Sequence, residues 1–284
     1  MTRHLSISFA LLLIFNPAVH SQTPPASPEH KLIDDIKAHT SGMAIWWTGH
    51  NGWLIKQDSI LIGTDLVLEN EDRQSPAPVS AAEIAPLLDI SFITHEHGDH
   101  FGRNTSRILA EQSNCMFVMP VNCVEIAKAE TGIPAARIRA AIPRQPFTLR
   151  GVGITPMRAI HGNPKFAVFE EANLEDCGYF IALGDKTLLQ PGDTVLLEDH
   201  LFLKHVDVLF FSPTEHNMYI QQSVILINEL EPDYILPQHR DTMTETEQNR
   251  YWTHGYSREV RLMLSKTLKE RYHILGMGKK IEIR

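Results

Sequence analysis

Residues 93–102 carry the feature that most constrains this chain of 284 residues. Four side chains that commonly bind metal ions fall within six positions of this segment: His95, His97, Asp99 and His100. Side chains two apart in an extended segment point the same way, so the first two histidines can bind one cation from one side. Asp99 and His100 follow at the expected turn and first helical position, from which they can reach a second cation. Because imidazole and carboxylate ligands suit zinc, iron and manganese, the segment predicts a catalytic metal site.

Short apolar runs and helical patterns alternate along the rest of the chain. The predicted strands are residues 43–47, 52–56, 59–62, 89–94, 116–119, 148–160, 178–183, 187–190, 206–211 and 234–237. The predicted helices are residues 81–88, 102–112, 221–229 and 256–272. Two strand-rich halves with helices between them fit a layered α/β sandwich. With 43% hydrophobic residues, the chain can bury the large core that one such domain needs.

The pattern His-x-His-x-Asp-His at residues 95–100 resembles the signature of the metallo-β-lactamase superfamily. This resemblance implies a four-layer αββα sandwich and metal-dependent hydrolysis. It also implies three further ligands in a fixed order along the chain, and the sequence supplies each of them. His161 follows a predicted strand, Asp193 lies in a strand-Gly-Asp-Thr element, and His239 ends a late strand.

The same resemblance distributes these residues over two divalent metal ions, with Asp193 bridging them. The first ion would be held by His95, His97, His161 and Asp193, and the second by Asp99, His100, His239 and Asp193. Zn²⁺ is the expected metal, and Mn²⁺ or iron would also suit these ligands. Two cations lower the pKa of a water between them, so that a bridging hydroxide becomes the nucleophile. Asp99 and Asp193 are therefore the residues assigned to catalysis.

Two segments, one well before the first predicted ligand and one that ends at the last, narrow the expected class of substrate. Residues 45–50 and 237–239 resemble the branch that contains ascorbate-6-phosphate lactonase and related phosphodiesterases and phospholipases. An ester, a lactone or a phosphodiester is the expected substrate. In relatives an aspartate directly follows the strand at 61–62, but here Gly63 and Thr64 precede Asp65. The sequence therefore leaves open whether Asp65 orients a ligand as that aspartate does.

Three alternative functions remain open. β-Lactam hydrolysis is one, although those relatives place the third histidine in a Gly-His-Thr context and lack the bridging aspartate, whereas Gly-Asn-Pro follows His161 here. Binding of metal or ligand without turnover is another, although all seven expected ligands are present. Redox chemistry on iron is the third.

Loops at the ends of strands often carry specificity in layered α/β folds. Three histidines in such loops are the candidates for substrate binding: His50, His216 and His254. The tryptophans at 46, 47, 53 and 252 could shape an apolar pocket, although core packing is the commoner role of this residue.

The first residues indicate export. Arg3 and the apolar run at 5–15 predict a signal peptide over residues 1–21, followed by a proline- and serine-containing linker at 22–30 and a hydrolase domain at 31–284. The run is too short to span a bilayer, so we expect a periplasmic or secreted protein without a membrane span in its mature form. The three cysteines, Cys115, Cys123 and Cys177, allow one disulfide at most, and the sequence does not say which of them would pair. Cys115 and Cys177 lie in apolar runs, so we expect them to be buried as small apolar side chains.

The charge of the chain excludes one class of partner. A formal net charge of −8 leaves no basic surface of the kind that phosphate backbones require. We therefore expect a small-molecule substrate and no nucleic acid. The sequence does not determine the oligomeric state.

Overall fold

A computed structural model describes residues 32–162 and 172–284 of the chain. The chain divides into two units, Met1–His30 and Lys31–Arg284, and the fold described below is that of the second unit. The predicted signal peptide and linker fall outside the described residues. No helix in the described ranges is long and apolar enough to cross a membrane.

The first sheet has seven strands, which begin as antiparallel neighbours and continue as parallel ones. Their spatial order is β13 (Lys280–Ile283), β1 (Met43–Gly49), β2 (Gly52–Gln57), β3 (Ile60–Thr64), β4 (Ile90–Phe92), β5 (Met116–Pro120) and β6 (Ile138–Ala141). From β3 to β6 the strands are parallel, so their carboxyl ends lie at one edge of the sheet.

The second sheet has six strands, which begin as parallel neighbours and continue as antiparallel ones. Their spatial order is β12 (Tyr234–Pro237), β11 (Val208–Phe211), β10 (Lys186–Gln190), β9 (Cys177–Leu183), β8 (Val152–Arg158) and β7 (Phe147–Leu149). β10, β11 and β12 are parallel, and β8 runs in the same direction because both β8 and β10 are antiparallel to β9. These four strands also end at one edge.

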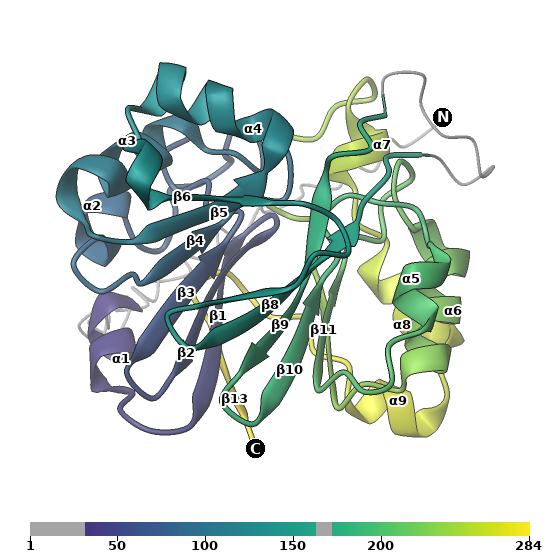
Figure 1. Cartoon of the computed structure of the whole chain (residues 1–284). Helices are drawn as coiled ribbons and strands as arrows, with labels where there is room; N and C mark the ends of the chain where they lie inside the picture. The colour runs from purple at the N-terminus through teal and green to yellow at the C-terminus, as the bar shows by residue number, and fades with distance from the viewer. Residues whose placement is uncertain (1–31, 163–171) are drawn as a thin grey trace, which may run out of the picture. The chain divides into compact units, whose positions relative to one another are not determined.

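Helices cover the outer face of each sheet, as Figure 1 shows. The first sheet is covered by α1 (Leu32–Ala38), α2 (Ala81–Ile84), α3 (Arg103–Gln112) and α4 (Val121–Ile126), and the second by α5 (Glu198–Leu201), α6 (Tyr219–Leu230), α8 (Ser257–Met263) and α9 (Lys266–Glu270). The two sheets face each other between these helical layers. The predicted four-layer αββα sandwich is confirmed.

The alternation of side chains along each strand explains the three cores. In β1, Ile45 and Trp47 point between the sheets, whereas Trp46 points into the core beneath α1 to α4. In β11, Phe210 points between the sheets and Phe211 points toward α6 and α8. Successive strand residues point to opposite faces, so strands buried on both faces require continuous apolar runs. This requirement accounts for the composition of the strands.

Two predicted elements differ from the structure because each contains an unrecognised break. The predicted strand 148–160 is the hairpin of β7 and β8, which turns at Arg150 and Gly151 with φ values of 49° and 80°. The predicted helix 256–272 is two helices, because Ser265 accepts a hydrogen bond from the backbone N–H of Leu268 and starts α9 anew.

All three cysteines are free and buried, which confirms the burial expected of Cys115 and Cys177. Burial raises the pKa of each thiol above its ordinary value, so the thiolate form is disfavoured. These side chains serve as small packing groups rather than nucleophiles.

Candidate metal centre

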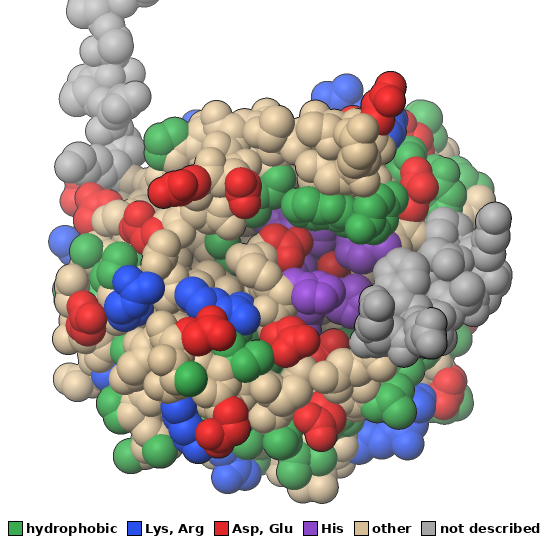
Figure 2. All heavy atoms as spheres, turned by 90° about the horizontal axis from the view of Figure 1, so that it is seen from above, with side chains coloured by type: hydrophobic (Ala, Val, Ile, Leu, Met, Phe, Trp, Pro, Cys, Tyr) green, Lys and Arg blue, Asp and Glu red, His purple; other side chains and the backbone are tan. Residues whose placement is uncertain are grey.

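The predicted metal ligands lie at the edge where the parallel strands of both sheets end. His95 follows β4, His161 follows β8, Asp193 follows β10 and His239 follows β12. Viewed from above this edge, histidine side chains gather in a hollow together with acidic ones (Figure 2). Because strands far apart in sequence share one direction, residues separated by up to 144 positions (from 95 to 239) meet at this edge.

Three histidines form the first group of ligand atoms. His95 Nε2 lies 3.1 Å from His97 Nδ1. The ring of His161 lies 4.7 Å from that of His95 and 4.9 Å from that of His97. One nitrogen from each of the three lies within 4.8 Å of the others. His161 Nε2 is buried without a hydrogen-bond partner among the described residues, which suits a nitrogen that binds a metal ion.

The second group contains a carboxylate and three histidines. Asp99 Oδ2 lies 3.8 Å from His100 Nε2 and 3.7 Å from His239 Nε2. His50 Nε2 lies 2.9 Å from the same carboxylate oxygen. All four ligand atoms lie within 4.8 Å of one another, and three of them belong to the predicted second metal site.

Asp193 lies between the two groups. Its Oδ2 is 3.0 Å from His239 Nε2 and 3.4 Å from His100 Nε2 in the second group, and 3.7 Å from His161 Nε2 in the first. One carboxylate therefore reaches both groups, as a bridging ligand must. The structure thus brings together all seven residues that the sequence selected as ligands.

The electrostatic environment favours the ionisation states that metal ligands need. Burial first, and the neighbouring histidines second, hold the pKa of His95 well below its usual value, so this imidazole is neutral. Burial lowers the pKa of His239 to about 3. Burial alone would raise the pKa of Asp193, but His239 and His100 hold it well below its usual range. Neutral imidazoles and ionised carboxylates are the forms that bind divalent cations.

The carboxylates around His100 stabilise positive charge on its ring. Burial opposes protonation there, yet Asp193, Asp99 and Asp65 together raise the pKa of His100 well above its usual value. A divalent cation at this position would satisfy the same carboxylates. The donor set therefore fits divalent metal binding.

Asp65 contacts the predicted ligand His100 and can orient it, a role that the sequence left open. β3 extends to Thr64, so Asp65 directly follows the strand. Its Oδ2 lies 2.9 Å from His100 Nδ1 and accepts a hydrogen bond of 2.8 Å from Thr94 Oγ1, while its Oδ1 accepts one of 2.8 Å from the backbone N–H of Thr94. The sequence interpretation ended the strand two residues too early. The missed signal was the β-prone Thr64 at the end of the apolar run.

Replacing Asp65 by alanine is expected to weaken metal binding by about 10- to 100-fold, because a partner that fixes a ligating histidine typically contributes this much. Competition with a chromophoric chelator measures the affinity. Asp72→Ala removes an exposed carboxylate from the following loop and should leave the affinity unchanged. Equal affinities of the Asp65→Ala variant and the wild type would contradict the orienting role.

Two glycines at this edge allow neighbouring segments to pack closely. The first helical turn begins at Arg103, so His100 lies in a turn before α3 rather than at a helical position as predicted. At Gly102 an added Cβ would lie 2.8 Å from the carbonyl oxygen of Leu66. Gly192 has a φ of +67°, and an added Cβ there would lie 2.9 Å from Thr94 Cβ. The approach at Gly192 places the Asp193 loop against the strand end that carries His95, and the approach at Gly102 places the start of α3 against the loop after Asp65.

The three histidines predicted to bind substrate have different positions. His50 contacts Asp99, and its backbone carbonyl accepts a hydrogen bond of 3.1 Å from the His239 N–H. His216 Nε2 lies 2.8 Å from Asp193 Oδ2. His254 instead lies beside Glu245, 2.9 Å from Nδ1 to Oε2, outside the clustered ligand groups of the described residues. The substrate contacts of all three stay predictions.

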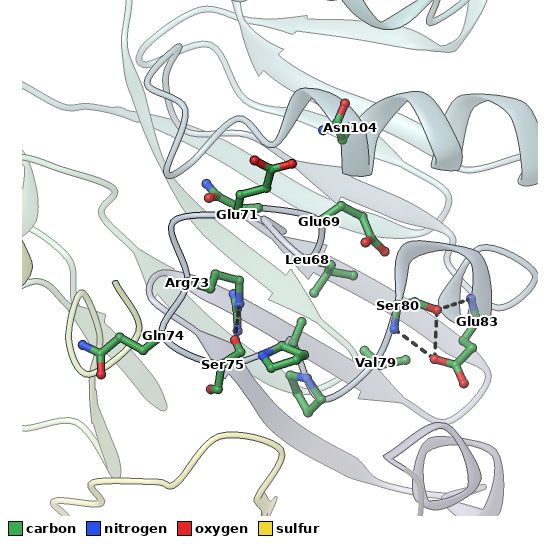
Figure 3. A pocket seen from close by; sticks show the side chains of 14 residues that line it. Leu68, Glu69, Glu71, Arg73, Gln74, Ser75, Val79, Ser80, Glu83 and Asn104 are labelled. Atoms are coloured by element: carbon green, nitrogen blue, oxygen red, sulfur yellow. Dashed lines mark hydrogen bonds between the residues drawn. The ribbon is translucent and has the colours of Figure 1, made fainter. Parts of the chain in front are cut away.

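A separate pocket of about 600 Å³ lies along the loop between β3 and α2 (Figure 3). Its polar side chains have structural partners. Arg73 donates to the carbonyl oxygens of Val67 and Thr48, and Glu69 accepts a hydrogen bond from the Ala81 N–H. We therefore interpret this pocket as part of the scaffold that holds the loop after Asp65.

An αββα sandwich with histidine and aspartate ligands at its strand ends defines the class of metal-dependent hydrolases of the metallo-β-lactamase type. A family profile described as "Beta-lactamase superfamily domain" matches residues 60–240, more than half of the chain. The chain therefore belongs to this family. The match includes all seven predicted ligands.

Individual relatives are similar in the same way. A "UPF0173 metal-dependent hydrolase" of Carboxydothermus hydrogenoformans is 25% identical over 209 residues, which cover 70% of this chain and 85% of the relative. The structure of Igni18, a metallo hydrolase from Ignicoccus hospitalis, aligns with a TM-score of 0.64 at 18% identity, covering 84% of this chain and 97% of Igni18. An isothiocyanate hydrolase from Delia radicum gut bacteria aligns with a TM-score of 0.67 at 13% identity, covering 85% and 100%. These structural matches support the fold.

Proposed function

We propose that this metal-dependent hydrolase is an exported, binuclear enzyme that cleaves an ester, lactone or phosphodiester bond. The position of Asp193 supports two metal ions most directly, because one carboxylate oxygen lies within 3.7 Å of histidines from both ligand groups. A mononuclear site would need only one of these groups.

The seven predicted ligands would be shared between the two metal ions. The first ion would be held by His95, His97, His161 and Asp193, and the second by Asp99, His100, His239 and Asp193. When bound, two such cations activate a water molecule and polarise the bond under attack.

Burial of the ligands contributes to the same chemistry. His95 and His239 are 1% and 0% exposed, and Asp193 is 2% exposed. Charges interact more strongly in such a water-poor environment, so the carboxylates hold cations firmly and with fixed geometry. His97 is exposed on the solvent side of the site, which leaves one side open to substrate.

The choice of bond rests on residues outside the ligand set. The turn that carries His50 and the segment before His239 resemble those of lactonases and phosphodiesterases, as the sequence indicated. A net charge of −8 favours small molecules over nucleic acids as substrates. The apolar run at residues 5–15 supports export, which mass analysis of the mature N-terminus in a periplasmic extract would test.

Metal content and turnover together test this proposal. Protein purified without chelators should contain two equivalents of zinc or manganese per chain, measured by elemental analysis. The same preparation should hydrolyse at least one compound in a panel of lactones, phosphodiesters and carboxylic esters. Two metal equivalents without turnover would favour a binding protein, and a single iron would favour oxygen chemistry. Nitrocefin turnover with none of the panel cleaved would indicate a β-lactamase.

His254→Ala is expected to raise KM and leave kcat within about twofold, because His254 lies outside the ligand groups and its loss would remove the predicted substrate contact together with the contact to Glu245. Steady-state kinetics on the best panel substrate measure both constants. A large fall in kcat with an unchanged KM would contradict a role in substrate binding.

A further inference from the structure

Two neighbouring aromatic rings lie against the histidine cluster. The ring of Tyr251 lies 5.9 Å from that of His216 at an interplanar angle of 87°. The ring of Trp252 lies 6.1 Å from that of His50 and 6.3 Å from that of His239. Both belong to α7 (Arg250–Thr253), at the edge where the strands end. Hydrophobic side chains border the hollow of histidines in Figure 2.

Trp252 differs from the other tryptophans of the chain. Trp46, Trp47 and Trp53 are at most 1% exposed and pack in the cores, so they take no part in a pocket at this edge. Trp252 is only half-buried, and Tyr251 next to it is 47% exposed. A half-exposed pair of rings beside a polar site offers apolar surface that a ligand can cover.

The helix that carries these rings is held firmly on the protein. The carbonyl oxygen of Tyr251 accepts a hydrogen bond of 3.0 Å from the Glu215 N–H, and Glu215 in turn accepts one from Tyr256 Oη. At Gly255 an added Cβ would lie 2.8 Å from the carbonyl oxygen of His239. Because only glycine allows this approach, the segment packs directly on the backbone of a predicted ligand. The backbone that carries the two rings is therefore anchored beside the metal centre.

From this arrangement we propose that Tyr251 and Trp252 form an aromatic wall that selects substrates with a flat apolar or aromatic group next to the scissile bond. The proposal rests on the proposed hydrolase function and adds the class of substrate. The flat group of the substrate would pack against the two rings, either with its edge or with its face. The bond under attack would then lie over Asp193 and the histidines around it. Hydrophobic burial and ring contact would then favour aromatic over small aliphatic substrates.

The first test measures binding without turnover. Calorimetry on the zinc-loaded protein compares phenylphosphonate with methylphosphonate, which share the same metal-binding group. The wild type should bind the phenyl compound about tenfold more tightly, as expected for one added aromatic contact. Tyr251→Ala and Trp252→Ala should each bring the ratio of the two affinities close to one. Equal affinities of the wild type for the two compounds would overturn the proposal. Binding of neither compound at millimolar concentration would also overturn it.

Two variants separate the wall from general structural effects. Tyr251→Phe keeps the ring and should keep the preference. Phe202→Ala removes a ring that is 76% exposed at the end of α5 and should also keep it. Loss of the preference in Phe202→Ala would count against the wall.

Ester kinetics make the two proposals distinguishable. Methyl benzoate and methyl acetate should differ in KM, and Tyr251→Ala should remove that difference with kcat nearly unchanged. Absence of turnover over the whole panel of lactones, phosphodiesters and carboxylic esters, with an intact phosphonate preference, would overturn the hydrolase proposal and support the wall as a binding surface. Ester turnover without any preference for benzoate would overturn the wall alone.

Discussion

Replacing Asp193 by alanine is expected to lower kcat/KM by about 1000-fold or more, because the two metal ions would lose their shared ligand. The variant should also retain no more than one equivalent of metal after dialysis. His239 and His216 would lose the carboxylate oxygen that lies 3.0 Å and 2.8 Å from their Nε2 atoms. Elemental analysis and steady-state kinetics on the same preparation measure both effects.

Two further variants show whether charge or position is decisive. Asp193→Asn keeps the size of the side chain but not its charge, so its activity should remain close to that of the alanine variant. Asp207→Ala removes another buried carboxylate, which precedes β11 at the opposite edge of the sheet and accepts hydrogen bonds from Thr187. This control should keep both metal equivalents. Two equivalents and wild-type turnover in Asp193→Ala would rule out a bridging role.

The grouping of the seven predicted ligands at one edge was predictable because their signals are local or ordered. His95 and His97 stand in one short segment, and His161, Asp193 and His239 each directly follow an apolar strand. The resemblance to a known signature then specified which of many histidines to choose. What the sequence could not supply was the distance between segments, since that depends on how the strands of two sheets align.

The partners of the ligands were much harder to find for the same reason. Asp65 approaches His100 only because β3 and β4 are parallel neighbours that end at the same edge. His50 approaches His239 across the gap between the two sheets. Neither contact has a sequence pattern of its own.

Edge strands and short helices escaped prediction for a different reason. β6 and β13 each bury a single side chain and pair along one side only, so neither has a continuous apolar run. α1 is a single short amphipathic helix. Their formation depends on pairing or packing with neighbours rather than on local preference.

A buried amide pair beneath the metal centre joins the strands that carry two of its ligands. Gln238 Nε2 donates to Gln190 Oε1 at 2.7 Å, and Gln190 Nε2 donates to Gln238 Oε1 at 2.9 Å. Trp53 Nε1 donates to Gln238 Oε1 at 2.8 Å from the other sheet. Gln238 precedes His239 directly, and Gln190 lies three residues before Asp193. The pair therefore fixes the separation of β10 and β12 where these ligands begin.

Replacing Gln238 by alanine is expected to lower the free energy of unfolding by about 3 kcal/mol, because it removes two hydrogen bonds of the Gln190 amide and leaves the indole N–H of Trp53 buried without its partner. Metal affinity should fall as well, since His239 would lose its fixed support. Denaturant unfolding of the metal-free protein measures the first effect and chelator competition the second. Gln222→Ala, which removes a buried amide in α6 that accepts a hydrogen bond from the Leu196 N–H, should lower stability but leave metal affinity unchanged. Equal metal affinities in both variants would show that the amide pair supports the fold without positioning the ligands.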